Sequence, residues 1–399
     1  MTSAHQTSDG VAVHGTVDDG FGPVMDEFVR NFDQRSDVGA GCTIYVRGRV
    51  AVDVWAGVAD RRSGRPFEHN TMTVMFSCTK GVMAVCAYLL VQEGRLDLDL
   101  PIAHYWPEFA QAGKERITVR HAMAHRAGLA YLDTDLTLDD VVAWDPVIRA
   151  IEAQSPHHAP EDGHAYHAST IGWILGEVVR RITGLTPGTY FRRALGDPLS
   201  LDTWIGIPAS ERGHMAWMEP PLPDDDSEFA KGFARLANER HLVRAMSLGK
   251  AFAFPAADGQ VTFNDPIIQA AEVPGAGGVG SAASLARLYA ACVTGVDGMP
   301  ALLSPGSISD GLRVQSAGPQ LTGQPDDGAR WGTGFQISSA PSQPMLGETS
   351  FGHTGAGGQL AFADVDHEAS FAYLTNQMGG YGDQRARSLV EALRTVLGA

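Results

Sequence analysis

A serine and a lysine three residues apart carry the clearest chemical signal in the sequence. Residues 75–81 read MFSCTKG and lead into an apolar run that is typical of a buried helix. Residues three apart at the start of a helix share a face, so the amine of Lys80 can approach the hydroxyl of Ser77. A desolvated lysine has a lowered pKa, and its neutral amine can accept the serine proton. The pair therefore predicts a nucleophile, with the Ser77 N–H at the helix N-terminus as an oxyanion donor.

The spacing alone is a weak signal, because Ser247 and Lys250 repeat it. A serine before a helix is more often only a cap, followed by an ordinary exposed lysine. Only four of the 30 basic residues are lysines, however, and Lys80 is followed directly by GVMAVCAYLLV. Ser247 has a glycine inside its spacing and no comparable apolar helix after it. The context favours Ser77, and we expect the second match to be accidental.

Composition excludes several classes of protein. The 399 residues are 44% apolar and 19% charged, which is typical of a globular chain and not of a disordered one. A formal charge of −16 repels phosphate backbones and anionic lipids, so we expect no nucleic-acid partner and no membrane partner. The N-terminus shows no secretion signal, which favours a cytoplasmic location. Four scattered cysteines indicate reduced thiols and neither a disulfide scaffold nor a zinc site.

The N-terminal part of the chain is expected to form strands before the helix that carries Ser77. Residues 1–20 are polar and glycine-rich, and we expect them to be loose. Apolar residues at helical spacing predict a first helix near 22–34. Two β-branched runs within 41–62, broken at residues 47–49, predict an antiparallel hairpin. Residues 71–95 then read as one helix.

The C-terminal part repeats this combination of strands and helices. Residues 281–295 predict a helix, two apolar runs flanking 366–368 predict a hairpin, and residues 385–397 predict a closing amphipathic helix. The chain between these regions looks mostly helical. We therefore expect an α+β fold with an antiparallel sheet built from both termini, flanked by terminal helices. The expected domains are a discontinuous sheet domain of residues 1–74 and 260–399 and a helical domain of residues 75–259, with the active site in the cleft between them.

Several motifs follow one another in order along the chain. They are the S-x-x-K segment with its lead-in (71–80), EGRLDLD (93–99), ITVRHAMAHRAGL (117–129), YHAS (166–169), GGVGS (277–281) and FGHTGAGG (351–358). From about residue 25 to the C-terminus the sequence thereby resembles the serine β-lactamase-like hydrolases, in particular family VIII carboxylesterases and class C β-lactamase relatives. The resemblance implies the β-lactamase/transpeptidase-like fold, with no metal and no cofactor.

The same resemblance implies a role for individual residues. Ser77 would be the acylated nucleophile, Lys80 its activating partner, and Tyr166 the shared base that takes the serine proton and later activates water. The backbone N–H groups of Ser77 and Ala356 would form the oxyanion hole.

Two motifs depart from the family pattern. The Tyr-x-Asn motif reads YHAS, so the hydroxyl of Ser169 would replace an amide that steadies the acyl carbonyl. The Lys-Thr-Gly motif reads His353-Thr354-Gly355. Without its lysine, this third motif lacks the permanent cation that holds a substrate carboxylate in β-lactamases and D-peptidases, which favours neutral esters. We expect His353 to bond to the catalytic hydroxyls and to change protonation near neutral pH.

Other signals are weaker. The G-x-G-x-x-G match at 275–280 does not follow an apolar strand, so we expect only a tight turn that feeds a helix beside the pocket. His121 and His125 have the spacing of a zinc peptidase pair, but alanine replaces the glutamate, and a supporting role in the fold is expected. No G-x-S-x-G occurs, although His353 as principal base stays open as an alternative. Trp331 either lines the acyl pocket or belongs to the core.

These observations predict a metal-independent serine esterase that cleaves short acyl esters through an acyl-enzyme on Ser77. An acyltransferase that passes the acyl group to a specialised alcohol is the main alternative. A β-lactamase or D-amino-acid peptidase is less favoured because of His353. A catalytically silent binding relative is disfavoured, since nothing in a binding role demands Ser77, Lys80 and Tyr166 together. The expected partner is a small-molecule ester, and the sequence leaves the oligomeric state open.

Overall fold

The computed structural model describes residues 5–221, 239–253, 262–323, 326–339, 344–380 and 383–399. Within them, one antiparallel sheet of eleven strands runs in the order β1-β2-β4-β3-β14-β13-β12-β11-β10-β9, with β5 paired to β4. Its N-terminal strands are β1 (His5–Gln6), β2 (Ala12–Val17), β3 (Gly39–Val46), β4 (Arg49–Asp60) and β5 (Arg65–Pro66). The C-terminal ones are β9 (Ser316–Ala317), β10 (Arg330–Trp331), β11 (Gln336–Ile337), β12 (Ser350–Gly355), β13 (Gln359–Asp364) and β14 (Ala369–Thr375).

The two ends of the chain meet where β3 pairs with β14, from Ala369 opposite Val46 to Thr375 opposite Ala40. This pairing confirms the α+β fold with a sheet built from both termini. Both predicted hairpins are also present, β3–β4 and β13–β14. The expectation that residues 1–20 are loose is wrong for residues 5–20, because β1 pairs with β2 and β2 pairs with β4, while residues 1–4 lie outside the described part of the chain. These residues look polar because β2 lies near the edge of the sheet and buries only Val13 fully.

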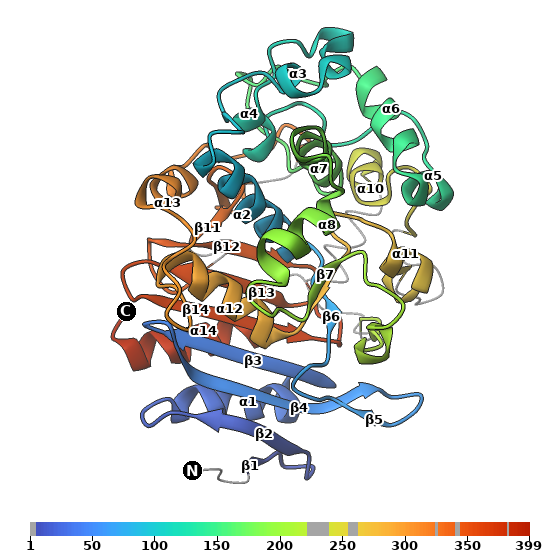
Figure 1. Cartoon of the computed structure of the whole chain (residues 1–399). Helices are drawn as coiled ribbons and strands as arrows, with labels where there is room; N and C mark the ends of the chain where they lie inside the picture. The colour runs from blue at the N-terminus through green and yellow to red at the C-terminus, as the bar shows by residue number, and fades with distance from the viewer. Residues whose placement is uncertain (1–4, 222–238, 254–261, 324–325, 340–343, 381–382) are drawn as a thin grey trace.

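Helices cover both faces of the sheet (Figure 1). On one face α1 (Gly22–Gln34) packs beside α14 (Arg385–Leu397), over large side chains such as Phe362 and Phe371. On the other face α12 (Ala282–Val293) and α2 (Cys78–Gln92) pack over the small side chains of Ala361 and Ala363. Because side chains alternate along a strand, β13 presents large residues to one layer and alanines to the other. The alanines leave room for α12 and α2 to approach the sheet closely.

Helix α2 is buried along almost its whole length, which explains its continuous apolar sequence. The expectation of one helix over 71–95 is wrong at its start, because Thr73–Val74 form strand β6. Strand β6 pairs with β8 (Gly278–Gly280), which also pairs with β7 (Thr203–Ile205). Only these distant partners make residues 73–74 a strand.

Helices α7 (Thr170–Thr183) and α8 (Pro187–Phe191) pack against α2, which also contacts β12 and β13 of the sheet (Figure 1). The small sheet β6-β8-β7 takes strands from both expected domains, and the expected boundaries remain a prediction because residues 254–261 lie outside the described part. No helix among the described residues is long and apolar enough to cross a membrane. The other α-helices of the described residues are α3 (Ile102–Tyr105), α4 (Val119–Met123), α5 (Leu138–Ala143), α6 (Asp145–Ala153), α10 (Arg240–Ser247), α11 (Pro266–Ala270) and α13 (Pro305–Leu312).

Candidate active site

Ser77 stands at the N-terminus of α2, where the chain turns sharply out of β6. Phe76 has a φ of 46°, a left-handed conformation that costs a non-glycine residue about 1–2 kcal/mol. The side chain of Ser77 makes no capping bond to the helix, so its hydroxyl is not used as a cap. Instead, Lys80 Nζ and Tyr166 OH each donate to Ser77 Oγ at 3.0 Å. The structure thus brings together the three residues expected to react.

Lys80 is buried beside Ser77 and has one further partner. Its Nζ donates to the carbonyl oxygen of Gly275 at 2.6 Å. Burial lowers the pKa of Lys80 to about 7, because no carboxylate among the described residues compensates the lost hydration. At neutral pH a large fraction of this amine is therefore unprotonated and able to accept a proton.

The segment 275–280 holds Lys80 through the carbonyl of Gly275. The expectation of a turn that feeds a helix is incomplete, because the turn at 274–276 leads into strand β8 before α12 begins. Gly278 is required for the fit, since a Cβ there would lie 2.5 Å from Thr79 Oγ1. The Gly278 N–H donates to that same hydroxyl at 3.0 Å, which joins β8 to the first turn of α2.

Tyr166 is held by a set of rings around its own. Its ring stacks on Trp331 at a centroid distance of 5.0 Å and contacts His125 at 4.8 Å and His353 at 6.3 Å. Burial raises the pKa of the Tyr166 phenol, so the resting side chain is neutral. Between Tyr166 and Lys80, the group that is unprotonated near pH 7 is Lys80.

His353 is buried and neutral. Its Nδ1 donates to the carbonyl of Thr354 at 2.6 Å, which leaves Nε2 as a hydrogen-bond acceptor without a partner among the described residues. Burial, together with the charge of Lys80, lowers the pKa of His353 to about 3. The expectation that this histidine changes protonation near neutral pH is therefore wrong. It makes no hydrogen bond to Ser77 or Tyr166 in the part of the chain described, which is unfavourable for a principal base.

The end of β12 lies against the start of α2. The Cys78 thiol donates to the His353 carbonyl at 3.1 Å, and a Cβ on Gly355 would lie 2.3 Å from the carbonyl oxygen of Met75. The N–H and the hydroxyl of Thr354 both donate to Gln336 Oε1 at 3.0 Å, so both groups are bonded to β11. Across the described residues, neither the Ser77 N–H nor the Ala356 N–H donates to another group. Two free amides near the nucleophile match an oxyanion hole.

Two other expected residues differ in their contacts. Trp331 belongs to the ring cluster with Tyr166 and His353, and its indole N–H has no partner in the described part of the chain. Ser169 donates to the Met246 carbonyl at 3.4 Å and is not hydrogen-bonded to Ser77, Lys80 or Tyr166.

The second S-x-x-K match is accidental, as predicted. Lys250 is 72% exposed and pairs with Asp135 at 3.2 Å. Ser247 donates to the Gly249 carbonyl, so serine and lysine do not meet.

The sequence did not reveal how closely one histidine approaches the site. His121 caps α4 together with Thr118, so its expected supporting role is confirmed. His125, in contrast, contacts both Tyr166 and Trp331 at 4.8 Å. Its φ is 60°, a left-handed conformation, and its Nδ1 accepts from the His167 N–H at 3.2 Å. The sequence signal that could have indicated this proximity is the position of His125 within the motif 117–129.

The chain matches the β-lactamase family over residues 26–394. It belongs to that family. This β-lactamase-family chain is 31% identical to the esterase/beta-lactamase LipL of Mycobacterium tuberculosis, over 94% of this chain and 86% of that protein. It is also similar to the crystal structure of a family VIII carboxylesterase, with a TM-score of 0.84, 31% identity, and coverage of 96% and 99% of the two chains. A penicillin-binding protein homologue from Caulobacter crescentus gives a TM-score of 0.83 at 32% identity, with the same coverage.

Acid is expected to destabilise this family member through its buried histidines. Burial lowers the pKa of His167 and His353 to about 3, whereas an unperturbed histidine titrates at 6.5. Between these values the unfolded chain binds more protons, so the free energy of unfolding decreases as the pH falls from about 6.5 to 3. We expect Tm, measured by circular dichroism, to fall from pH 7 to pH 4. In His353→Asn the fall in Tm should be smaller than in the wild type. An equal fall in both proteins would contradict the lowered pKa of His353.

Proposed function

We propose that the chain is a serine hydrolase that cleaves carboxylic esters with short acyl groups through a covalent acyl-enzyme on Ser77. The observation that carries this proposal is the pair of 3.0 Å bonds that Lys80 and Tyr166 make to the Ser77 hydroxyl. A serine bonded to a base of lowered pKa is the arrangement of an activated nucleophile. Relatives named esterase and carboxylesterase support ester chemistry on this scaffold.

The proposed reaction has two halves. In the first, Ser77 Oγ attacks the ester carbonyl carbon while its proton passes through the Tyr166 hydroxyl toward neutral Lys80. The carbonyl oxygen becomes an oxyanion between the Ser77 and Ala356 amides. As the intermediate collapses, Tyr166 protonates the departing alcohol, and the acyl group stays on Ser77. In the second half, water loses its proton to the same pair, attacks the acyl carbon and releases the acid.

The third motif supports neutral substrates. A neutral His353 with an accepting Nε2 offers a carboxylate neither a cation nor a hydrogen-bond donor. An anionic group placed there would lose its hydration without compensation. β-Lactams and D-peptides, which carry such a carboxylate, are therefore less suitable substrates than uncharged esters.

A panel of chromogenic substrates tests the proposal on the wild-type protein. We expect p-nitrophenyl acetate and butyrate to be cleaved faster than the decanoate, and nitrocefin and a D-alanyl p-nitroanilide to be cleaved far more slowly. The p-nitrophenyl monoester of succinic acid matches the butyrate in chain length but carries a carboxylate. We expect kcat/KM for the succinate monoester to be lower than for the butyrate by at least about tenfold, which is the effect of one unpaired charged group.

The same panel separates hydrolysis from acyl transfer. Product analysis in the presence of added alcohols should show the free acid as the main product. A predominance of new esters would favour the acyltransferase alternative. Turnover of nitrocefin but not of the esters would contradict the proposal.

A further inference from the structure

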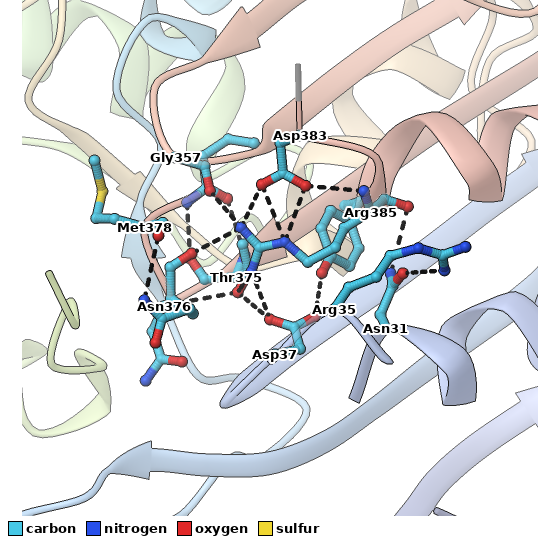
Figure 2. Close-up of polar contacts among 12 residues, drawn as sticks. Asn31, Arg35, Asp37, Gly357, Thr375, Asn376, Met378, Asp383 and Arg385 are labelled. Carbon is cyan, nitrogen blue, oxygen red and sulfur yellow. Dashed lines mark hydrogen bonds and ion pairs between the residues drawn. The ribbon is translucent and has the colours of Figure 1, made fainter. Parts of the chain in front are cut away.

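A buried ion network contacts Gly357, the residue that follows Ala356 in the chain (Figure 2). Arg385, the first residue of α14, is only 3% exposed at its side chain. Its guanidinium donates to Asp37 Oδ1 at 3.0 Å and forms an ion pair with Asp383. Asp37 is itself completely buried and also accepts from the hydroxyls of Tyr373 and Thr375. We call Arg385, Asp37 and Asp383 the α14 network.

One nitrogen of the Arg385 guanidinium bonds to the turn between β12 and β13. Nη2 donates to the carbonyls of Gly357 and Gln377, each at 3.0 Å. The Gly379 N–H donates to the same Gly357 carbonyl at 3.1 Å. Residues 356–358 form the tight turn between β12 and β13, so this fixed carbonyl belongs to the residue after Ala356.

The network and the turn are in close contact. Gly358 has a φ of +101°, and a Cβ there would lie 2.5 Å from Asp383 Oδ2. A Cβ on Gly379 would lie 1.7 Å from the same oxygen. No side chain fits between the carboxylate and the backbone, so a shift of the network would move the turn.

The chemistry of the α14 network indicates that it orients the backbone around it more than it stabilises the fold. Buried ion pairs are often replaceable by apolar residues without loss of stability, because desolvation offsets their attraction. A guanidinium, however, is a rigid planar fork that holds several acceptors at fixed positions. Here it connects β14, α14 and the turn that bears one oxyanion donor.

We propose that Arg385 is a positioning residue that holds the Ala356 N–H in place to receive the oxyanion. This inference rests on the proposed function. It predicts that disturbing Arg385 lowers transition-state stabilisation while leaving ground-state binding of the ester almost unchanged.

Arg394 provides a matched control for a purely structural role. It lies on the same helix and donates to the carbonyls of Leu346 and Met345, which are not part of the turn. Arg385→Lys and Arg394→Lys both keep the charge and remove the fork. Comparing them separates the effect on the turn from a general loosening of α14.

The experiment measures kcat and KM for p-nitrophenyl butyrate, and the affinity for a boronic acid whose tetrahedral serine adduct places an oxygen in the oxyanion hole. We expect Arg385→Lys to lower kcat by about tenfold to a hundredfold, less than the loss of a whole donor. Boronic acid affinity should fall in parallel and KM should change by less than about twofold. Arg394→Lys should leave all three near wild type. Equal losses of kcat in the two variants, or a rise in KM alone, would overturn the proposal.

A second readout does not depend on activity. Amide hydrogen exchange in peptides covering residues 353–362 should be faster in Arg385→Lys than in wild type and unchanged in Arg394→Lys. If the wild-type protein cleaves no ester, the proposed function fails, while unchanged exchange in Arg385→Lys refutes the positioning role. If Arg385→Lys does not fold, Asp383→Asn should show the same pattern of kcat, KM and exchange, and its absence would equally refute the role.

Discussion

Ser77→Ala should lower kcat for p-nitrophenyl butyrate by at least about 10,000-fold, because the proposed reaction forms its acyl-enzyme on the Ser77 hydroxyl. Intact-protein mass spectrometry during turnover should show a transient acyl adduct on the wild type and none on the variant. Ser247→Ala is the matched control, since it removes the serine of the second S-x-x-K match, whose lysine is exposed. It should keep full activity. A fully active Ser77→Ala protein would exclude the proposed nucleophile.

The fold of Ser77→Ala should be retained. Ser77 makes no capping bond to α2, so the helix loses no hydrogen bond when the hydroxyl is removed. Lys80 and Tyr166 both lose their bond to the Ser77 hydroxyl. Lys80 keeps its bond to the Gly275 carbonyl, whereas the Tyr166 hydroxyl keeps no partner among the described residues. We expect a loss of about 1 kcal/mol in unfolding free energy, too little to unfold the protein. Thermal unfolding followed by circular dichroism checks this expectation.

Lys80→Met should lower kcat by about 1,000-fold, within the range expected for loss of a general base. In the wild type, burial lowers the pKa of Lys80 to about 7, and in the proposed reaction the unprotonated amine is the active form. Acylation should therefore rise with pH and level off above about pH 8. In Lys80→Met the remaining activity should lack this rise.

The pH profile distinguishes catalysis by Lys80 from a structural effect. Lys250→Met removes the lysine of the second match, an exposed side chain paired with Asp135, and should keep both the rate and the pH profile of wild type. A wild-type rise near pH 7 that survives in Lys80→Met would show that another group titrates. In that case Lys80 would not be the base.

Much of the local structure could be predicted because it depends on neighbouring residues. The closing helix was expected at 385–397 and is α14, since its apolar residues recur at helical spacing. The hairpin around 47–49 is β3–β4, because two β-branched runs are separated by a short turn. Local patterns failed for residues 73–74, which form a strand only through pairing with β8 and thereby β7.

The sequence by itself indicated the pair of Ser77 and Lys80, because the two residues are three apart at the start of an apolar helix, a context that the second S-x-x-K match lacks. The resemblance also indicated Tyr166, but only the tertiary structure decided which bonds the distant groups make to the pair. Tyr166 is 89 residues from Ser77, and the Gly275 carbonyl is 195 residues from Lys80. Only the packed chain could show that His353 stays neutral, because its pKa depends on burial and on the charge of Lys80. Hydration and long-range contacts arise from packing, and no local spacing records them.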